Sequence, residues 1–385
     1  MIKTSLVWTM MLLVGQYSWG INTDQTLFTG FGTFGASVID SNERFNDFGT
    51  EEYNSTSFTR DSKIGFNVTK SLGGSKRFAF QTVMLGDRNS FSPEVDLAFL
   101  ASKIDNTGFE ILMGRVVAPI WLYSEEQSIG YNSPWIRPPT LLYSTATLRN
   151  ADGAGIRYVK PMADGVLSVQ VIYGASAFPA MTTQTIPNGS GGLTKANIKT
   201  HVKIDDLVAS EIRYDRNSWT FRIGYSRSRT ATDIVTTTLG VPNVGIYSSV
   251  KHKNGEMKSV GLNGTFGNSV FATEYANLAI SPDNINYFEG GYFSYGYKMG
   301  DWTPFVTYSQ KSSLDGANFT VTNDPLGQTK ITKSEAYAIS MNYYGFENIV
   351  VKTGVTSFIE SYNRSLNGSD KNDFNVYTIL TDIVF

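Results

Sequence analysis

The sequence predicts an all-β fold, a transmembrane antiparallel up-and-down β-barrel of sixteen strands. Three observations predict it: apolar and polar residues alternate along many segments, pairs of apolar residues recur five positions apart across short polar breaks, and hydropathy is neutral despite many aromatic residues. The 385 residues include 24 Phe, 21 Tyr and 36 Gly, and the mean hydropathy is −0.16. A lipid-exposed barrel explains this combination because lipid-facing and water-facing side chains alternate along each strand.

The first twenty residues have the pattern of a secretory signal peptide. Lys3 supplies the only charge, residues 6–14 are almost wholly apolar, and Ser18-Trp19-Gly20 places small residues where a signal peptidase reads them. The alternative is a membrane anchor, but a spanning helix needs about 20 apolar residues. We therefore expect residues 1–20 to be a signal peptide cleaved after Gly20, and residues 21–385 to form one outer-membrane barrel domain.

The alternation is clearest from Trp219 to Ser226, where every odd-numbered residue is apolar or aromatic and every even-numbered one is polar, small or charged. A period of two places alternate side chains on opposite faces of a strand. The same pattern predicts half-buried strands at Val95/Leu97/Phe99, Leu167/Val169/Val171/Tyr173, Tyr337/Ile339/Met341/Tyr343, Ile349/Val351/Thr353/Val355 and Tyr377/Ile379/Thr381/Ile383/Phe385.

Five pairs of apolar residues five positions apart indicate short hairpin turns. They are Ile104 and Phe109, Met162 and Leu167, Tyr214 and Trp219, Phe266 and Phe271, and Tyr297 and Trp302. In a two-residue turn such partners lie directly opposite on one face. We expect each pair to project outward beside its turn, so that the rings gather at one membrane interface.

These patterns predict sixteen strands, beginning near Leu27, Phe58, Phe78, Val95, Phe109, Ile156, Leu167, Val208, Trp219, Met257, Val270, Tyr287, Trp302, Thr332, Ile349 and Phe374. The linkers after odd-numbered strands are longer, including 116–155, 175–199, 230–255 and 311–330. Short turns at one end and long loops at the other are the plan of outer-membrane barrels. Hydrocarbon offers the backbone no hydrogen-bond partner, so the first strand is expected to pair with the last. Sixteen strands leave an aqueous lumen.

Composition excludes several classes of function. The chain has no cysteine, which excludes disulfides, thiolate catalysis and Cys-based metal sites. Its two histidines, His201 and His252, fall in or near long loops without an accompanying nucleophile motif, so we expect no enzyme activity, no resident metal and no cofactor. A net charge of −2 gives no support to nucleic-acid binding.

Three segments carry a resemblance to a known family. Residues 377–385 alternate and end in the aromatic Phe385, the Gly-rich stretch 28–35 opens the first strand, and residues 114–143 combine Gly114-Arg115 with Pro119, Tyr123-Ser124, Gly130-Tyr131, Pro134-Trp135-Ile136-Arg137-Pro138-Pro139 and Tyr143. These segments resemble the general porins of the Gram-negative outer membrane and similar proteobacterial proteins. The Pro-Glu-Phe-Gly-Gly element of enteric general porins is missing, so the constriction residues of that group do not transfer.

The resemblance implies a passive diffusion channel in the outer membrane, commonly a homotrimer in contact with lipid. It also implies that the C-terminal strand, ending at Phe385, is the assembly signal read by the barrel-assembly machinery.

The long third loop is expected to fold into the lumen and to narrow it. It carries Glu125, Glu126 and Arg137 together with several aromatic residues. Loops of more than about 15 residues in a compact fold are usually functional. The alternation places further charges on the lumen side of the wall, with Lys63, Arg77, Arg157, Arg213 and Arg222 as cations and Asp96, Glu110, Glu211 and Glu274 as anions. Opposed charges across a wet constriction would select solutes by charge and dipole.

Each of these residues also has a structural interpretation. If Arg216-Asn217 forms the turn, Glu211 lies directly opposite Arg222, and the two form only a cross-strand contact. Glu125 and Glu126 would be solvated if the loop stays outside the barrel. The loop aromatic residues are more often packing than a sugar-binding surface.

The function predicted from these observations is passive diffusion of small hydrophilic solutes and ions through a water-filled barrel. The alternative is an outer-membrane barrel with a largely closed lumen that acts as a surface binder, adhesin or receptor through its long loops.

Overall fold

The computed structural model describes residues 22–23, 26–40, 55–86, 91–143, 148–187, 193–238, 245–281, 288–313, 329–364 and 368–385. The expected signal peptide and its cleavage site lie outside these ranges. Among the described residues no helix is both long and apolar enough to cross a membrane.

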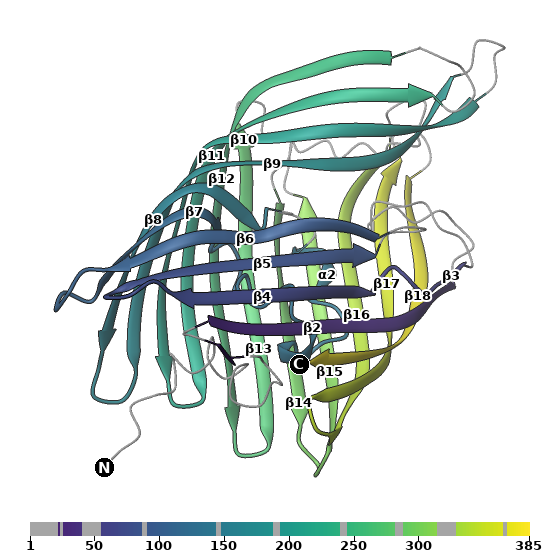
Figure 1. Cartoon of the computed structure of the whole chain (residues 1–385). Helices are drawn as coiled ribbons and strands as arrows, with labels where there is room; N and C mark the ends of the chain where they lie inside the picture. Colours follow the sequence, from purple (N-terminus) through teal and green to yellow (C-terminus); the bar gives the residue numbers. More distant parts are fainter. Residues whose placement is uncertain are drawn as a thin grey trace.

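Sixteen long strands form one closed antiparallel sheet (Figure 1). In chain order they are β2 (Thr26–Asp40), β4 (Lys63–Ser71), β5 (Lys76–Gly86), β6 (Phe91–Lys103), β7 (Phe109–Val117), β8 (Asn150–Pro161), β9 (Val166–Pro187), β10 (Leu193–Arg216), β11 (Trp219–Thr238), β12 (Gly245–Phe266), β13 (Ser269–Ser281), β14 (Phe288–Tyr297), β15 (Trp302–Ser313), β16 (Thr329–Phe346), β17 (Ile349–Arg364) and β18 (Gly368–Val384). Two short strands, β1 (Asn22–Thr23) and β3 (Ser55–Ser57), pair with β2. The predicted sixteen-stranded barrel is confirmed.

Pairing of β18 with β2 closes the barrel. The register runs from Val384 opposite Phe31 to Asn375 opposite Asp40. Beyond it, Gly30 and Phe385 exchange two backbone hydrogen bonds of 2.6 and 2.9 Å. The expected contact between the first and last strands is therefore present, and it continues to the C-terminal residue.

The predicted strand starts lie within the long strands or beside their first residues, except for Phe58. The second long strand begins at Lys63, five residues later than expected. The hydroxyl of Ser62 donates to the Phe58 carbonyl at 2.6 Å, and the Ser62 amide donates to Thr59 O at 2.8 Å. These bonds form a bend, which removes Phe58 from the ladder and leaves it 70% exposed.

The turn between β10 and β11 differs by one residue from the expected turn. Arg216 pairs with Trp219, so Asn217 and Ser218 form the turn, and Asn217 takes the left-handed conformation that asparagine tolerates (φ 51°). Arg222 consequently lies opposite Arg213, and Glu211 opposite Gly224. The expectation that Glu211 lies directly opposite Arg222 is wrong.

The five apolar pairs share a face, as expected, but only one pair is directly opposite. Ile104 and Phe109 are joined by a backbone hydrogen bond of 2.8 Å in the expected register. In the other four hairpins the partners are diagonal neighbours, because the turn is displaced by one residue. It begins one residue later after Tyr214 and Tyr297, and one residue earlier after Met162 and Phe266. The ring centroids are 5.7 Å apart for Tyr214 and Trp219 and 5.5 Å apart for Phe266 and Phe271.

The two faces of the wall differ as the alternation predicts. On β11, Phe221, Ile223 and Tyr225 are 36%, 47% and 38% exposed, whereas the intervening Arg222 is completely buried. The outer face is therefore apolar and suited to lipid, and the polar side chains are directed to the inner face.

Strands β9 to β12 are much longer than expected, with 22, 24, 20 and 22 residues. The expected loops 175–199 and 230–255 belong largely to these strands, because the backbone pairing continues beyond the barrel. At about 3.3 Å per residue, such strands exceed the length needed for an apolar band of about 25 Å. Figure 1 shows them extending beyond the neighbouring strands.

If Ile223 faces lipid near the middle of the band, replacing it with a charge will destabilise the barrel. We expect Ile223→Arg to lower the free energy of unfolding in lipid vesicles by about 2–4 kcal/mol, and Phe221→Arg, nearer the turn, to lower it less. Ile223→Val is the control, with an expected loss of about 1 kcal/mol. Equal stability of Ile223→Arg and Ile223→Val in a urea titration would show that this face does not contact lipid.

Candidate functional site

The segment 118–149 joins β7 to β8 and carries the third-loop residues. It is described except for 144–147 and contains a 3₁₀ turn, η1 (Gly130–Asn132), and one helical turn, α2 (Thr140–Tyr143). Pro119, two residues after β7, lacks the amide that a strand ladder needs, which explains why β7 does not continue. The hydroxyl of Ser124 accepts hydrogen bonds from the Trp121 amide at 2.7 Å and the Ile120 amide at 3.2 Å, which fixes the first bend.

A buried charge cluster on β11 and β13 binds the beginning of this segment. Arg222 is fully buried and donates to Glu211 at 2.8 Å, to Ser259 at 2.9 Å and to the Pro119 carbonyl. Glu274 accepts from the Leu122 amide at 2.8 Å and from the Tyr143 hydroxyl at 3.1 Å. These two side chains therefore hold two separate parts of the segment against the wall.

A second buried charge, Lys352 on β17, binds the middle of the segment. Its ammonium donates to the carbonyls of Gly130 at 2.8 Å, Ser133 at 2.7 Å and Trp135 at 3.2 Å. It also lies 2.8 Å from Asp382 on β18, whose other oxygen accepts from Thr33 at 2.5 Å. A buried ion pair is stable only when its hydrogen-bonding capacity is satisfied, and here three carbonyls and a carboxylate satisfy the ammonium.

Three further polar contacts fix residues 134–137. Arg137 forms a bidentate ion pair with Asp61, at 2.5 Å for both bonds. Trp135 donates its indole N–H to Ser294 on β14 at 2.6 Å, and the Asn342 amide on β16 donates to the Pro134 carbonyl at 2.9 Å. The segment is thus hydrogen-bonded to strands far from its own position between β7 and β8.

The aromatic residues of the segment are packed rather than presented to solvent. Trp121, Trp135 and Tyr143 are 1%, 4% and 5% exposed. Trp121 stacks on Tyr143 at a centroid distance of 5.2 Å, and Trp135 meets Tyr292 edge-on at 5.3 Å. This burial favours the packing interpretation over a sugar-binding surface.

Apolar contacts complete the attachment. One cluster joins Trp121, Trp135 and Leu142 of the segment to buried residues of β5–β10 and β12–β14. A second places Leu141 against Ile39 and Phe358, together with Ala336, Phe374 and Val376.

The structure brings together most of the charges predicted from the sequence. Glu125 contacts Arg157 at 2.9 Å, Arg77 pairs with Glu110 at 3.2 Å, and Arg213 pairs with Asp215 at 3.0 Å. Asp96 accepts from Ser128 at 2.5 Å, and Lys63 donates to the Gln127 carbonyl at 3.4 Å. Glu125, Glu211 and Arg213 also line one small recess beside Gln170.

Burial divides the candidates into two groups. Arg222, Glu274 and Glu110 are 0%, 2% and 5% exposed, so they do not line an open passage in this structure. Glu125 has 39% of its side chain exposed, Arg213 has 23%, and Arg77 and Arg157 each have 20%. These four predicted residues therefore keep part of their charged side chains open to water.

The neighbouring carboxyls Glu125 and Glu126 have opposite pKa shifts. Burial opposes ionisation of Glu125, but the charges of Arg157, Arg213 and Arg77 outweigh it and lower the pKa. Burial raises the pKa of Glu126, and Arg213 offsets this only in part. Glu126 therefore takes up a proton at a higher pH than Glu125 does.

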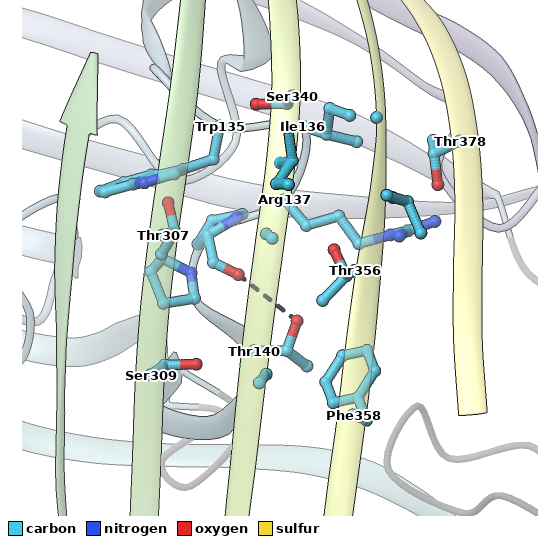
Figure 2. A pocket seen from close by; sticks show the side chains of 17 residues that line it. Trp135, Ile136, Arg137, Thr140, Thr307, Ser309, Ser340, Thr356, Phe358 and Thr378 are labelled. Atoms are coloured by element: carbon cyan, nitrogen blue, oxygen red, sulfur yellow. Dashed lines mark hydrogen bonds between the residues drawn. The ribbon is translucent and has the colours of Figure 1, made fainter. Parts of the chain in front are cut away.

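A cavity of about 40 Å³ lies between residues 135–140 and strands β15 to β18. Figure 2 shows Trp135, Arg137 and Thr140 together with hydroxyl-bearing side chains of the strands. The latter include Thr307, Ser309, Ser340, Thr356 and Thr378. A polar cavity of this size holds little more than ordered water.

Sequence reasoning missed Lys352, Asp382, Asp61 and Asp215. Lys352 alternates with Val351 and Thr353, and Asp382 with Thr381 and Ile383, so the alternation itself places both on the inner face. Applying the same period of two to every charged residue of the last two strands would have identified Lys352 and Asp382.

No cluster of three or more possible metal ligands occurs among the described residues. The side chains of His201 and His252 are not among those described, so the histidine-based alternatives lie outside the structure.

Comparison with solved structures shows which fold this chain shares. The trimer form of OmpT, an outer membrane protein of Vibrio cholerae, matches with a TM-score of 0.56 and 12% identity, over 94% of this chain and 100% of that chain. An anion-selective porin from Comamonas acidovorans matches with a TM-score of 0.53 and 12% identity, over 94% and 99%. OmpF of Salmonella typhi, in complex with daunomycin, matches with 0.55 and 15%, over 95% and 100%.

No protein-family model and no curated protein sequence matches the chain. At these identities the structural likeness shows the fold alone, which is that of porin barrels of the outer membrane.

Removing the Lys352 charge will destabilise the attachment of the segment. Lys352→Met leaves Asp382 buried without its cation and three carbonyls without a donor, and breaking a buried ion pair costs about 3–5 kcal/mol. We expect a matching loss in the free energy of unfolding and faster proteolysis between residues 130 and 139. Replacing both partners, in Lys352→Met/Asp382→Leu, is expected to restore part of the stability, whereas Lys298→Met, at the exposed turn after β14, changes neither measurement. A Lys352→Met protein as stable as wild type would contradict this role.

Proposed function

We propose that the mature chain, residues 21–385 after removal of residues 1–20, is an outer-membrane channel for passive diffusion of small hydrophilic solutes and ions. The observation that carries the proposal is a closed sixteen-stranded wall with an apolar outer face and charged residues on its inner face. The fold shared with an anion-selective porin and with OmpF supports it.

We infer that the segment 118–149 lies across the lumen and forms its constriction. The support is the set of bonds that connect it to inner-face side chains on strands remote from β7 and β8, above all Arg222 and Lys352. In this arrangement the carboxylate of Glu125 faces the guanidinium groups of Arg157 and Arg213. Charges of opposite sign around a narrow aqueous passage would orient dipolar solutes and screen ions by charge.

In this proposal the chain performs no covalent chemistry and holds no cofactor. Passage needs only a wet lumen, so no nucleophile or general base is required. We further propose a homotrimer in contact with outer-membrane lipid, supported by the trimer form of the Vibrio cholerae protein. We also propose that the barrel-assembly machinery recognises Phe385. This residue bonds to Gly30 of β2 in the contact that closes the barrel, so it would be exposed as a signal before the barrel closes.

One observation favours a second function. Strands β9 to β12 extend well beyond the length that a bilayer requires, and the segment 118–149 packs apolar side chains against buried residues of the wall. Long strand ends, and a segment that would narrow the lumen if it lies across it, suit a surface binder with a largely closed lumen.

Channel recording separates the two functions. We expect the purified protein, reconstituted in a planar lipid bilayer, to give stepwise, long-lived ion currents, because a sixteen-stranded barrel retains a wet passage beside its constriction. Steps that occur in groups of three would support the trimer. A correctly folded, inserted protein that gives no current would contradict the channel and favour the surface binder.

Neutralising the two constriction carboxylates will change ion selectivity. We expect Glu125→Gln/Glu126→Gln to shift the reversal potential in a salt gradient towards anion preference, because two negative charges are removed beside Arg157 and Arg213. In the wild-type channel, cation preference is expected to fall as pH falls, first as Glu126 becomes protonated and then as Glu125 does.

The single variants assign the two steps. Glu126→Gln should remove the step at higher pH, and Glu125→Gln the step at lower pH. Asp164→Asn, at the turn between β8 and β9, is the control that changes charge outside the constriction. An unchanged reversal potential in the double variant would place both carboxyls outside the conducting path.

A further inference from the structure

The arginines on the inner face of the wall differ in how their charges are balanced. Arg77 donates to both oxygens of Glu110, at 3.2 Å each. Arg213 donates to both oxygens of Asp215, at 3.0 and 3.1 Å. Arg222 likewise forms ion pairs with carboxylates of neighbouring strands. The charge of each of these arginines is therefore balanced by the wall itself.

Arg157 on β8 is the exception among these arginines. Its Nε donates to the amide oxygen of Gln170, directly opposite on β9, at 2.8 Å. Glu110 lies opposite Arg157 on β7, but both of its oxygens are bonded to Arg77. Among the described residues, the one carboxylate within ion-pair distance of Arg157 is Glu125, which belongs to the segment 118–149.

The contact between Glu125 and Arg157 is a single bond. It joins Nη2 of the guanidinium to one carboxylate oxygen at 2.9 Å, and the side chains are 39% and 20% exposed. An ion pair that is open to water contributes little to stability. A carboxylate that forms two parallel bonds to a guanidinium binds it more strongly. A solute carboxylate with this geometry can therefore take the place of Glu125.

Gln170 holds the guanidinium in place without neutralising it. A guanidinium only donates hydrogen bonds, so the amide oxygen of Gln170 must face Nε. The bond to Nε leaves the terminal nitrogens Nη1 and Nη2 for partners from the segment or from the lumen. Gln170 is itself 4% exposed and lines the same small recess as Glu125 and Arg213. It is thus a positioning residue for Arg157.

The charges around Arg157 indicate which solutes suit the exchange. When a solute carboxylate binds Arg157, the carboxylate of Glu125 loses its cation. Glu126, the next residue, adds a second negative charge beside it. A cationic group on the same solute restores the balance, whereas a simple anion leaves these carboxylates uncompensated. An ammonium group beside a carboxylate is the arrangement found in α-amino acids.

We propose that Glu125 and Arg157 form an exchangeable ion pair that binds small zwitterionic solutes of the α-amino acid type. The solute carboxylate binds Arg157, the solute ammonium binds Glu125, and Gln170 keeps the guanidinium in position. This inference rests on the proposed channel function and names the solute class that the channel selects.

Block of the ion current by added solute tests this site. The probes, at neutral pH and in dilute salt, are L-alanine, propionate, which lacks the ammonium group, and ethylamine, which lacks the carboxylate. We expect L-alanine to block the wild-type current at a lower concentration than either of the other two. In Gln170→Glu we expect the half-blocking concentration of L-alanine to rise about tenfold, because a wall carboxylate then competes for the guanidinium.

A charge-matched variant separates the position of the carboxylate from the net charge. Gln170→Glu/Glu125→Gln has the net charge of wild type, but its carboxylate is on the wall and not on the segment. We expect L-alanine to block it as weakly as it blocks Gln170→Glu. Recovery of wild-type block in this double variant would show that net charge alone decides, and would overturn the proposal.

The control is Asn268→Asp, which makes an amide-to-carboxylate change at the exposed turn between β12 and β13. It should be blocked as wild type is. Equal block of wild type and Gln170→Glu by L-alanine, an equal loss in the control, or equal block by propionate and L-alanine would overturn this inference alone. Absence of any current through the wild-type protein would instead contradict the channel, and the inference with it.

Discussion

The architecture depends on the absence of hydrogen-bond partners in hydrocarbon. Each strand that crosses a bilayer must pair along both edges, so the sheet must close. Here the closing contact between β18 and β2 extends to Gly30 and Phe385, the last residue of the chain. A Cβ at Gly30 would come within 2.3 Å of the Phe385 ring, so any larger residue would displace that ring. The pairing of β18 and Phe385 with β2 thus completes the backbone hydrogen bonding of the barrel.

Closure with sixteen strands creates an interior that the wall side chains cannot fill alone. The apolar residues of 118–149 pack against inner-face residues. This packing also buries backbone carbonyls that need hydrogen-bond donors from outside the segment. Lys352 and Arg222 donate to four of these carbonyls, those of Gly130, Ser133, Trp135 and Pro119. The buried charges are therefore a consequence of placing irregular backbone against a barrel wall, where each carbonyl still needs a donor.

The strand pattern could be predicted from the sequence because it is a local property. A period of two on β11 determines which residues face lipid. The closed barrel follows from the number of strands and from the requirement that strands in a membrane pair along both edges. Register could not be predicted to one residue, because Asn217 or Arg216 can each begin a turn, and only the pairing of Arg216 with Trp219 decides between them.

The candidate site was predictable in composition but not in its contacts. Alternation placed Arg157, Arg213 and Arg222 on the inner face, yet nothing local distinguishes a water-exposed arginine from one buried under a distant segment. Arg222 binds Pro119, 103 positions away, and Lys352 binds Gly130, 222 positions away. The length of β9 to β12 was missed for a related reason, since the polar strand ends beyond the barrel lack the apolar alternation by which membrane strands are recognised.

Buried charges have a further effect on strand register. A slip of one residue exchanges the two faces of a strand, and a strand apolar on both faces would tolerate it. On β17 the slip would move Lys352 from its four partners to the lipid side, and on β11 it would do the same to Arg222. An arginine or lysine in the middle of the lipid-facing band costs about 2–4 kcal/mol, in addition to the bonds lost inside. The residues that hold the segment 118–149 thus also exclude the alternative registers of the strands that carry them.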